Sequence, residues 1–395
     1  MENIENKIPN GENQDTQNSS FFSENVSSSN GLEPKIRFVN FKENYRPLKI
    51  GDIYAERSER GAENMELLSV TINEGVKKRM DIDGKDTSSE DKSNYKIVHT
   101  GDMVYNSMRM WQGANGISDY DGIVSPAYTV LKSKGNIHNQ YIGFLFKNSE
   151  LINKFRKNSQ GLTSDTWNLK YPQIACIKIN IPSLDEQQKI ADFLSLVDQR
   201  IEKQRQLVES LKKYKRGLLS AIFDKISSTS TLTLGEICNI TTGKLDANAM
   251  VVGGKYRFYT CAREYFEIDT YAFDTDALLI SGNGANVGYI HHYCGKFNAY
   301  QRTYVLDGFQ ENIMYIYYYL QANLHPRIEA EKKAGNTPYI VLSTLSDMLI
   351  KLPAKERQNN IAKIFAILDK KIMVENDVLE RLNTQKQGLL QQMFI

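Results

Sequence analysis

The segment Ile181–Ala191, IPSLDEQQKIA, recurs at Leu352–Ala362 as LPAKERQNNIA, and this duplication decides how the chain is organised. The offset of 171 residues then holds without a gap to the C-terminus, so that Gly217–Leu219 falls on Gly388–Leu390. Chance does not keep register over so many positions, and a repeat of this kind indicates a repeated structural unit. The 395 residues therefore divide into two related halves.

The similarity extends upstream of these segments, although more loosely. Leu48–Ile53 parallels Leu232–Ile237 at an offset of 184 residues, so the first half carries about 13 extra residues. The order is variable domain, long helix, variable domain, long helix. The predicted boundaries are a tail over residues 1–33, a first variable domain over 34–180, a first helix over 181–226, a second variable domain over 227–351 and a second helix over 352–395.

The composition is that of an ordinary globular protein, with 41% hydrophobic and 24% charged residues. The formal net charge is +2, but Met1–Glu33 holds six acidic residues and one lysine, which leaves +7 for the remainder. That mild basic bias is compatible with nucleic-acid binding. The acidic tail is rich in Asn and Ser and has little apolar surface to offset the entropy of ordering, so we expect it to be disordered.

Neither a membrane segment nor a secretory signal is expected. No stretch approaches the roughly 20 apolar residues that cross a bilayer, and Met1–Glu33 lacks a basic segment followed by an apolar one. The four cysteines, Cys176, Cys238, Cys261 and Cys294, form no CxxC pair, which argues against a zinc site and fits reduced thiols. We therefore expect a cytoplasmic protein without a bound metal.

Both matched segments predict long helices with a heptad seam. The seam residues are Ile190, Leu194, Val197, Ile201, Val208, Leu211, Leu218 and Ile222 in the first copy, and Ile361, Phe365, Leu368, Ile372, Leu379, Leu382, Leu389 and Met393 in the second. Gln204 and Lys215, then Glu375 and Lys386, interrupt it at matching places, and such polar residues fix register and partner choice. A helix of about 33 residues is roughly 50 Å long. We expect an antiparallel coiled coil that acts as a spacer; the alternative is that each helix lies on its own domain.

The variable domains predict a mixed α/β fold. Strands are expected at Ile97–Tyr105, Tyr128–Leu131, Ile174–Ile181, Ala277–Ile280 and Thr303–Leu306, and helices at Asn139–Asn158 and Glu311–Lys333. At the start of the first long helix, Ser183 and Glu186 have the spacing of a capping box, which Ala354 removes from the second copy. The predicted architecture is two variable domains separated by two long helices, with an internal pseudo-twofold repeat.

The segments that resemble enzyme motifs depart from the patterns that the chemistry requires. Gly282–Gly288 has glycines like a dinucleotide-binding loop, but the third is one residue late and no βαβ unit with a downstream acid is evident. Ser125–Tyr128 differs at two decisive positions from the catalytic Asn-Pro-Pro-Tyr of adenine methyltransferases. The sequence contains no GxxxxGK[ST] loop for ATP, and its five histidines lack metal-ligand spacing. We expect neither catalysis nor a cofactor in this chain.

Two variable domains, each closed by Pro-x-x-(Glu)-x-Gln-x-x-Ile-Ala and a long helix, resemble the specificity subunit of type I restriction-modification enzymes. The resemblance covers residues 34–395. Its most specific parts are Ile181–Ala191 and the Lys-x-Gly-Leu-Leu near each helix end. The second copy departs from the pattern, because Arg357 stands where the first copy has Glu186.

This resemblance implies a DNA-recognition subunit that performs no chemistry itself. Each variable domain would be a target-recognition domain for one half of a bipartite, asymmetric site in double-stranded DNA, and the helices would set the spacing. Two modification subunits would dock on the helices and methylate adenine with S-adenosylmethionine. A separate restriction subunit would supply translocation and cleavage with ATP and magnesium, in defence against foreign DNA.

Residues that read DNA are expected in polar loops beside strands, because Arg and Lys suit guanine and Asn and Gln suit adenine. The candidates for base contacts are Arg109, Gln112 and Asn115 in the first domain and Arg257, Tyr259, Arg263, Asn283, Asn286, Tyr300, Gln301 and Arg302 in the second. The candidates for phosphate contacts are Lys77, Lys78, Arg79, Lys332 and Lys333. Each also fits a solvated surface or a loop-packing role, and Trp111 fits the core as well as insertion into DNA.

Two other classes of function stay open. A structural adaptor would use the helices to join protein partners and would show no salt-dependent affinity for DNA. A self-contained methyltransferase or nuclease would bind its cofactor as an isolated chain. Within the leading interpretation, a system that methylates without cutting has the same sequence features. The sequence of one chain does not identify the target bases.

Overall fold

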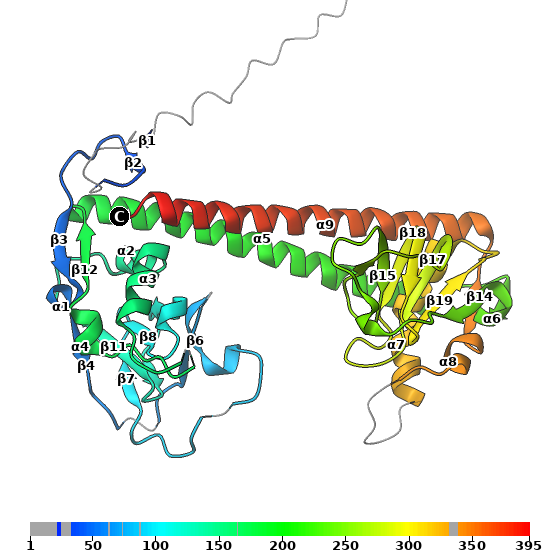
Figure 1. Ribbon diagram of the computed structural model, residues 1–395, viewed down its shortest axis with the longest axis horizontal. Coiled ribbons are helices and arrows are strands. Elements are labelled where there is room, and N and C mark those ends of the chain that lie inside the picture. Colours follow the sequence, from blue (N-terminus) through cyan, green and yellow to red (C-terminus); the bar gives the residue numbers. More distant parts are fainter. Residues whose placement is uncertain are drawn as a thin grey trace, which may run out of the picture. The chain divides into compact units, whose positions relative to one another are not determined.

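The computed structural model describes residues 22–24, 33–61, 64–72, 74–86, 88–163, 165–331 and 339–395. The chain forms two compact units: unit 1 consists of Met1–Glu202 and Leu379–Ile395, and unit 2 of Lys203–Val378. The long helices α5 (Leu184–Asp224) and α9 (Lys355–Gln392) therefore contribute to both units (Figure 1). No helix in the described part of the chain is long and apolar enough to cross a membrane.

Unit 1 contains many short strands. Before α5 its elements are β1 (Phe22–Glu24), β2 (Ile36–Phe38), β3 (Arg46–Lys49), α1 (Ile50–Ile53), β4 (Tyr54–Arg57), β5 (Leu68–Thr71), β6 (Gly75–Lys78), η2 (Arg79–Asp81), β7 (Lys96–Val98), β8 (Met103–Asn106), η3 (Met110–Gln112), β9 (Asn115–Ile117), β10 (Gly122–Val124), β11 (Tyr128–Ser133), α2 (Asn139–Leu145), α3 (Ser149–Asn158), α4 (Tyr171–Ala175) and β12 (Lys178–Ile181). The main sheet is antiparallel in the order β4-β11-β8-β9. Ile142 of α2 and Phe155 of α3 are fully buried, so these helices close the domain core.

Unit 2 has longer strands and a larger sheet. Its elements are β13 (Ser230–Thr233), α6 (Leu234–Ile237), β14 (Asn239–Thr242), η4 (Ala247–Ala249), β15 (Tyr256–Tyr259), β16 (Phe266–Ile268), β17 (Phe273–Ser281), β18 (Ile290–Ala299), β19 (Thr303–Asp307), α7 (Ile313–Glu331), α8 (Leu342–Ser346) and β20 (Leu349–Leu352). The six-stranded sheet has the order β14-β19-β17-β18-β15-β16, with only β15 and β18 parallel. Helix α7 packs on β17 and β18.

A shared frame precedes each long helix. In unit 1 β3 pairs antiparallel with β12, and in unit 2 β13 pairs antiparallel with β20. The helical turns α1 and α6 follow β3 and β13 and pack on α4 and α8. A Cβ on Gly51 would lie 3.0 Å from Ala175 Cβ, and a Cβ on Gly235 would lie 3.3 Å from Ser346 O. The looser upstream similarity therefore marks a close helix contact, at which a Cβ would require the neighbouring helix to shift by a few tenths of an ångström.

The glutamine of the repeated segment ties each long helix to its own variable domain. Gln187 and Gln358 are buried, and their side-chain amides donate to the carbonyls of Pro182 and Pro353, the second residues of the two segments, at 3.0 and 2.9 Å. Their side-chain oxygens accept the N–H of His138 at 3.0 Å and of Asn312 at 3.3 Å. His138 and Asn312 in turn accept an N–H from the first turns of α2 and α7. The glutamine thus satisfies a buried carbonyl before the long helix and a partly buried N–H before the domain helix.

The two long helices run antiparallel within each unit, which excludes the alternative that each only covers its own domain. The start of one helix and the end of the other share one core. These residues are Ile190, Leu194, Leu390 and Phe394 in unit 1 and Ile361, Phe365, Leu219 and Phe223 in unit 2. Every seam residue expected from the heptad pattern is buried or half-buried. The predicted antiparallel coiled coil is confirmed.

The polar residues that interrupt the seam have partners on the opposite helix. The pairs are Lys386–Asp198 at 2.5 Å in unit 1, and Lys215–Asp369 at 2.6 Å and Gln204–Glu375 at 2.6 Å in unit 2. The offset of 171 residues maps the first pair onto the second and joins the two equivalent positions of the third. These contacts therefore specify the register of the helix pair.

Part of the tail departs from the expected disorder. Strand β1, within residues 1–33, pairs antiparallel with β2. The ring of Phe22 lies 4.8 Å from that of Phe38 and 5.4 Å from that of Phe193 on α5. Burial of aromatic surface against α5 accounts for the order of this strand. The other residues of the expected tail, except Glu33, lie outside the described residues.

Glu186 does not close a capping box with Ser183. Its carboxylate accepts Arg37 Nε–H at 2.8 Å and Arg37 Nη2–H at 2.7 Å, and the two side chains are 0% and 5% exposed. Tyr45 OH donates to the same carboxylate at 3.3 Å. A buried carboxylate needs a charged, hydrogen-bonded partner, and the segment before β3 provides one.

Three expected elements are divided differently in the structure. Ile97–Tyr105 is two strands, β7 and β8, because Gly101 turns the chain between them with a φ of +88°. Ile174–Ile181 begins in α4, and only its end is β12. Asn139–Asn158 is α2 and α3, because the Asn148 side chain caps α3. The other three strands and α7 fall where expected, although Lys333 lies outside the described residues.

Candidate nucleic-acid interface

In unit 2 three polar loops meet beside the sheet. They are the loop after β15, the turn between β17 and β18, and the turn between β18 and β19. Cys261 Sγ lies 3.1 Å from Asn283 Oδ1 and 3.5 Å from Arg302 O, while Asn286 Nδ2 donates to Cys261 O at 3.0 Å. The candidates Asn283, Asn286 and Arg302 are therefore brought together around a half-buried thiol.

The backbone of this cluster is closely packed, whereas its long side chains are exposed. Gly282 N donates to Arg302 O at 2.9 Å, and a Cβ on Gly282 would lie 2.5 Å from that oxygen, so the position needs glycine. Gln301 and Arg302 are exposed beside a cavity of about 290 Å³, which Asn283 and Tyr339 also line. This arrangement places donor and acceptor groups on a rigid support, as base recognition requires.

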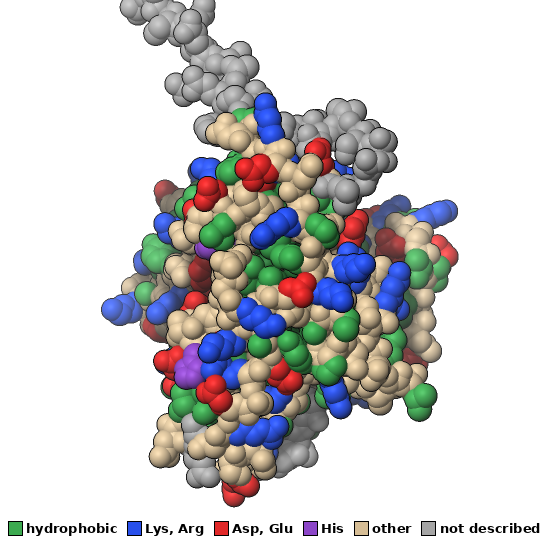
Figure 2. All heavy atoms as spheres, turned by 90° about the vertical axis from the view of Figure 1, so that its left-hand side faces the viewer, with side chains coloured by type: hydrophobic (Ala, Val, Ile, Leu, Met, Phe, Trp, Pro, Cys, Tyr) green, Lys and Arg blue, Asp and Glu red, His purple; other side chains and the backbone are tan. Residues whose placement is uncertain are grey.

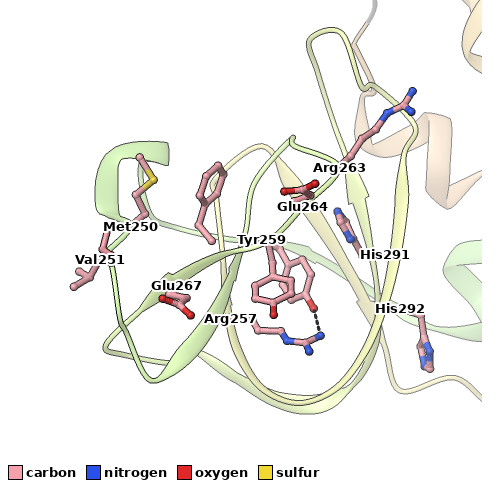
Figure 3. A pocket seen from close by; sticks show the side chains of 12 residues that line it. Met250, Val251, Arg257, Tyr259, Arg263, Glu264, Glu267, His291 and His292 are labelled. Carbon is pink, nitrogen blue, oxygen red and sulfur yellow. Dashed lines mark hydrogen bonds between the residues drawn. The ribbon is translucent and has the colours of Figure 1, made fainter. Parts of the chain in front are cut away.

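The remaining candidates of unit 2 have different surroundings. Arg263 is exposed, and its Nε donates to Asn286 Oδ1 at 3.3 Å. Tyr300 is half-buried, and its N–H donates to Tyr259 O at 2.9 Å. The Arg257 guanidinium donates to Tyr259 OH at 3.3 Å on the wall of a separate hollow (Figure 3). Tyr259 is 2% exposed, so it supports this wall rather than reaching outward.

In unit 1 the candidate loop forms η3 after β8. Arg109 is exposed, and its Nη1 donates to Gln112 Oε1 at 3.4 Å. Trp111 packs edge-on against Trp167 with ring centroids 5.3 Å apart, and its indole N–H donates to Met108 O at 3.0 Å. The indole of Trp111 therefore braces the loop that presents Arg109 and Gln112.

Asn115 was expected to contact a base, but the structure buries its side chain. Its side chain is 0% exposed, and Nδ2 donates to Gly113 O at 3.1 Å and to Phe146 O at 3.4 Å. The polar pattern of the loop suggested contact with DNA, but burial turns this amide into a support for the loop. The hydrogen bond from Asn115 on β9 to Phe146, which follows α2, shows that this side chain supports the loop.

The expected phosphate-binding residues of unit 1 are partly occupied by protein groups. Lys77 and Lys78 pair at 3.7 and 3.6 Å with Glu74 and Glu66. Arg79 donates to the carbonyls of Ile82, Gly84 and Lys85 at 2.8–2.9 Å, so it organises the following loop. Figure 2 shows Lys and Arg side chains interspersed with acidic and apolar ones on one face of the molecule. Lys332 and Lys333 lie outside the described residues.

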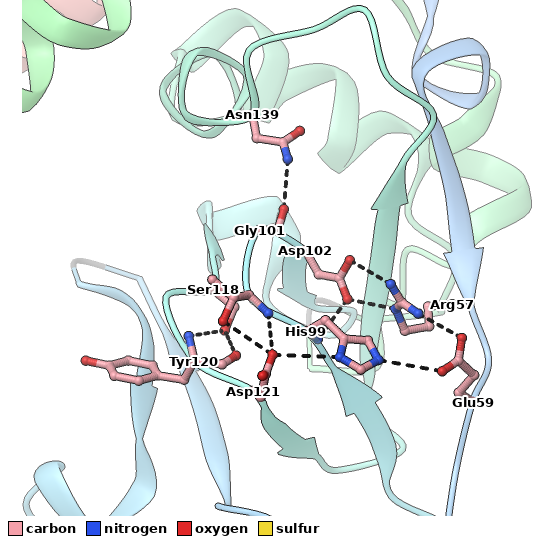
Figure 4. A network of polar contacts seen from close by, with 10 residues as sticks. Arg57, Glu59, His99, Gly101, Asp102, Ser118, Tyr120, Asp121 and Asn139 are labelled. Carbon is pink, nitrogen blue, oxygen red and sulfur yellow. Dashed lines mark hydrogen bonds and ion pairs between the residues drawn. The ribbon is translucent and has the colours of Figure 1, made fainter.

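A polar network that the sequence did not indicate braces loops of unit 1 (Figure 4). Arg57 donates to Asp102 at 2.8 and 3.2 Å and to Glu59 at 2.7 Å, and His99 lies 3.7 Å from both Glu59 and Asp121. The hydrogen bond from Arg57 lowers the pKa of Glu59, and the backbone N–H of Thr100 lowers that of Asp121. The network holds β4 to the turns before β8 and after β9. Across the described ranges, no cluster of three or more His, Cys, Asp or Glu side chains has the arrangement of a metal site.

Comparisons with known proteins all lead to the same kind of relative. The family model described as type I restriction modification DNA specificity domain matches twice, at residues 54–213 and 227–384. Over 133 residues the chain is 41% identical to the type I restriction enzyme EcoDI specificity subunit of Escherichia coli. Over 134 residues it is 23% identical to the type I restriction enzyme HindI specificity subunit of Haemophilus influenzae. These matches span 34% and 32% of this chain and 29% of each relative.

Two solved structures resemble the fold over nearly its whole length. The crystal structure of the type I restriction-modification system S subunit from M. genitalium superposes with a TM-score of 0.58 at 18% identity, covering 92% of this chain and 99% of that one. A chain from a structure of type I R-M complex assembly and conformational transition gives a TM-score of 0.57 at 15% identity, covering 89% and 97%. At these identities the likeness establishes the fold.

Proposed function

We propose that this chain, which belongs to the type I restriction-modification DNA specificity family, selects the DNA on which a type I restriction-modification complex acts. The observation that carries the proposal is the duplicated frame, in which Gln187 and Gln358 attach two different variable domains to long helices by the same contacts. A protein that reads two unlike half-sites needs this combination of a repeated support and unlike loops.

Each variable domain reads one half of a bipartite target in double-stranded DNA. The exposed loops that carry Arg109 and Gln112 in unit 1 and Gln301 and Arg302 in unit 2 supply the base contacts. Half-sites on one face of B-DNA lie about 34–36 Å apart. The 41 residues of α5 extend over about 60 Å, so the helix pair is long enough to set such a spacing.

Two copies of one modification subunit dock on the long helices. Leu196 of α5 and Ile367 of α9 occupy equivalent positions in the repeat and are 63% and 62% exposed. An exposed apolar side chain at the same place in both copies of the repeat can anchor the same partner surface twice. Because the same surface occurs twice in one chain, two identical partners satisfy it. S-adenosylmethionine, ATP and magnesium belong to the modification and restriction subunits of this assembly.

Methylation mapping tests the proposed function. DNA is taken from cells that express this chain with its modification subunit and from cells that lack the chain. We expect a split motif with modified adenine in both halves, which disappears when the chain is deleted. An unchanged methylation pattern, with both proteins verified as expressed, would favour a structural adaptor.

The docking surface has its own test. The double variant Leu196→Glu, Ile367→Glu places charges on both copies of the apolar surface. We expect it to lose co-purification with the modification subunit and to retain its affinity for the target duplex. The control variant Ser210→Glu, Arg381→Glu changes exposed, equivalent positions farther along the helices. Equal retention of the modification subunit by both variants would contradict docking at Leu196 and Ile367.

A further inference from the structure

A hollow in unit 2 has the chemistry of a site for a flat aromatic ligand. It encloses about 660 Å³ next to the hairpin β15–β16, within the range of about 300–1,000 Å³ for small-molecule sites (Figure 3). Tyr259, Tyr265, Phe266 and His291 contribute aromatic rings to its lining. Tyr265 and Phe266 are 45% and 39% exposed, so their rings are available to a ligand. Exposed aromatic rings grouped around a hollow are unusual on a monomer and suggest an occupant.

The arginine of this hollow is held in a fixed orientation. The Arg257 guanidinium carbon lies 4.3 Å from the ring centroid of Tyr265 and 4.5 Å from that of Tyr293. Its Nη1 donates to Tyr259 OH at 3.3 Å. A guanidinium has five N–H donors in one plane, and here the group lies over two aromatic rings and uses one donor in a hydrogen bond. Its other donors are therefore oriented before a ligand arrives.

His291 adds an acceptor to the same lining. Its Nε2 lies 3.0 Å from Ala262 O, and because a carbonyl oxygen only accepts, Nε2 carries the proton. Burial lowers the pKa of His291, which keeps the ring neutral near pH 7 and leaves Nδ1 as an acceptor. Donor and acceptor groups thus accompany the aromatic rings. This set matches the edges and faces of a nucleobase.

The charges of the hollow favour a neutral group over a phosphate. Arg257 and Arg263 are balanced by Glu264 and Glu267, all of which line the space. The two carboxylates would repel an anion, whereas they do not repel an uncharged base. Arg263 also donates to Asn286 of the candidate DNA-reading cluster, so the hollow adjoins the surface on which DNA is expected.

We propose that this hollow receives one unstacked base of the target DNA, with the exposed rings of Tyr265 and Phe266 and the polar groups of Arg257 and His291 in its lining. The proposal rests on the proposed function and names a further contact by which unit 2 selects its half-site. Extruding a base costs a few kcal/mol of lost stacking and pairing, and the cost is lowest at a mismatched base. A mismatch at the extruded position therefore strengthens binding instead of weakening it.

The test measures binding of the full-length chain to the duplex target that methylation mapping identifies. A series of duplexes carries one mismatch at each successive position of both half-sites. We expect most mismatches to weaken binding and one to strengthen it by about tenfold, which corresponds to about 1.4 kcal/mol. We expect the double variant Tyr265→Ala, Phe266→Ala to lose this gain. Because both side chains are substantially exposed, thermal unfolding of the variant should match that of the wild type.

Tyr271→Ala is the matched control, because Tyr271 is 46% exposed in the same unit and does not line the hollow. The control should retain the gain. A chain that binds the target duplex no better than unrelated DNA refutes the proposed function itself. Preferential binding of the target without any mismatch that strengthens it overturns the hollow as a base site. A gain that survives in the double variant, or that the control also loses, overturns it as well.

Discussion

Units 1 and 2 are alike where they meet the long helices and unlike where they present loops. Both frames have a strand pair, a glycine contact, a buried glutamine and a core completed by the opposite helix. Unit 1 then presents η3 beside a four-stranded sheet, whereas unit 2 presents three loops around Cys261 beside a six-stranded sheet. The contacts that set the geometry of the frame recur in both units, whereas the loops that we propose to read DNA differ.

One contact of the frame is itself asymmetric. Glu186 is buried against Arg37, but the equivalent Arg357 is exposed. Strand β2 of unit 1 supplies Arg37. The resulting ion pair with Glu186 is present at one of the two equivalent helix starts. The glutamine contacts therefore belong to both copies of the repeat, whereas the Arg37–Glu186 ion pair belongs to unit 1.

The largest expected difference between the halves concerns the Arg37–Glu186 ion pair. Glu186→Ala removes the carboxylate that accepts two hydrogen bonds from the buried Arg37 guanidinium and should lower the free energy of unfolding of unit 1 by about 3–5 kcal/mol. Arg357→Ala removes an exposed side chain and should change that of unit 2 by no more than about 0.5 kcal/mol. Hydrogen exchange of each unit under native conditions measures both. The double variant Arg37→Met, Glu186→Leu should recover most of the loss, and failure to recover would contradict the ion-pair explanation.

The frame glutamines should behave alike in the two units. Gln187→Leu or Gln358→Leu removes the donor to a buried proline carbonyl and the acceptor of a partly buried N–H before a domain helix, at a cost of about 1–3 kcal/mol each. Urea denaturation followed by site-specific probes in each unit measures this cost. Gln188→Leu, at an exposed neighbour, is the control. A large loss in only one unit would show that the two frames are not equivalent.

The reading loops should separate the halves functionally. Arg109→Ala and Arg302→Ala should each relax discrimination at one half-site by about 1–3 kcal/mol, because a lost Arg contact removes the preference for one base. Competition binding with targets altered in one half at a time measures the effect. Lys77→Ala should weaken binding to all sequences alike and reduce its salt dependence. If both arginine variants relax the same half-site, the assignment of one half-site to each unit is wrong.

The smallest expected effect is the pH dependence that the polar network of Figure 4 gives to unit 1. The pKa values of Glu59 and Asp121 are lowered in the folded state, so their stabilising contribution is present above the ordinary carboxyl range of about 4 and is lost as the pH falls through the lowered values. Both groups are exposed, so screening keeps the effect small. Thermal unfolding between pH 5 and about pH 3 should show a shallower decline in Glu59→Gln, Asp121→Asn than in the wild type. An unchanged decline would remove this network from the acid response.

The sequence predicted the arrangement of elements better than the surroundings of single residues. The heptad positions, α7 and three of the five expected strands lie where the local patterns placed them. The division of Asn139–Asn158 at Asn148 was missed, although an Asn within a helical pattern could have indicated a cap. The polar loops around Asn283 and Arg302 were located by composition, but burial of Asn115 was not, because composition does not report what packs on a loop.

The sequence by itself determined the duplication, the two long helices and their antiparallel pairing. The repeat and the apolar seams are visible in the order of residues, and each seam must pack against another helix. Only the tertiary structure decided which groups meet: Arg37 with Glu186, 149 residues apart, and Cys261 with Asn283 and Arg302. Such contacts depend on how strands pair and on which polar groups are buried. The spacing of apolar residues along the chain predicts neither the strand pairing nor which polar groups are buried.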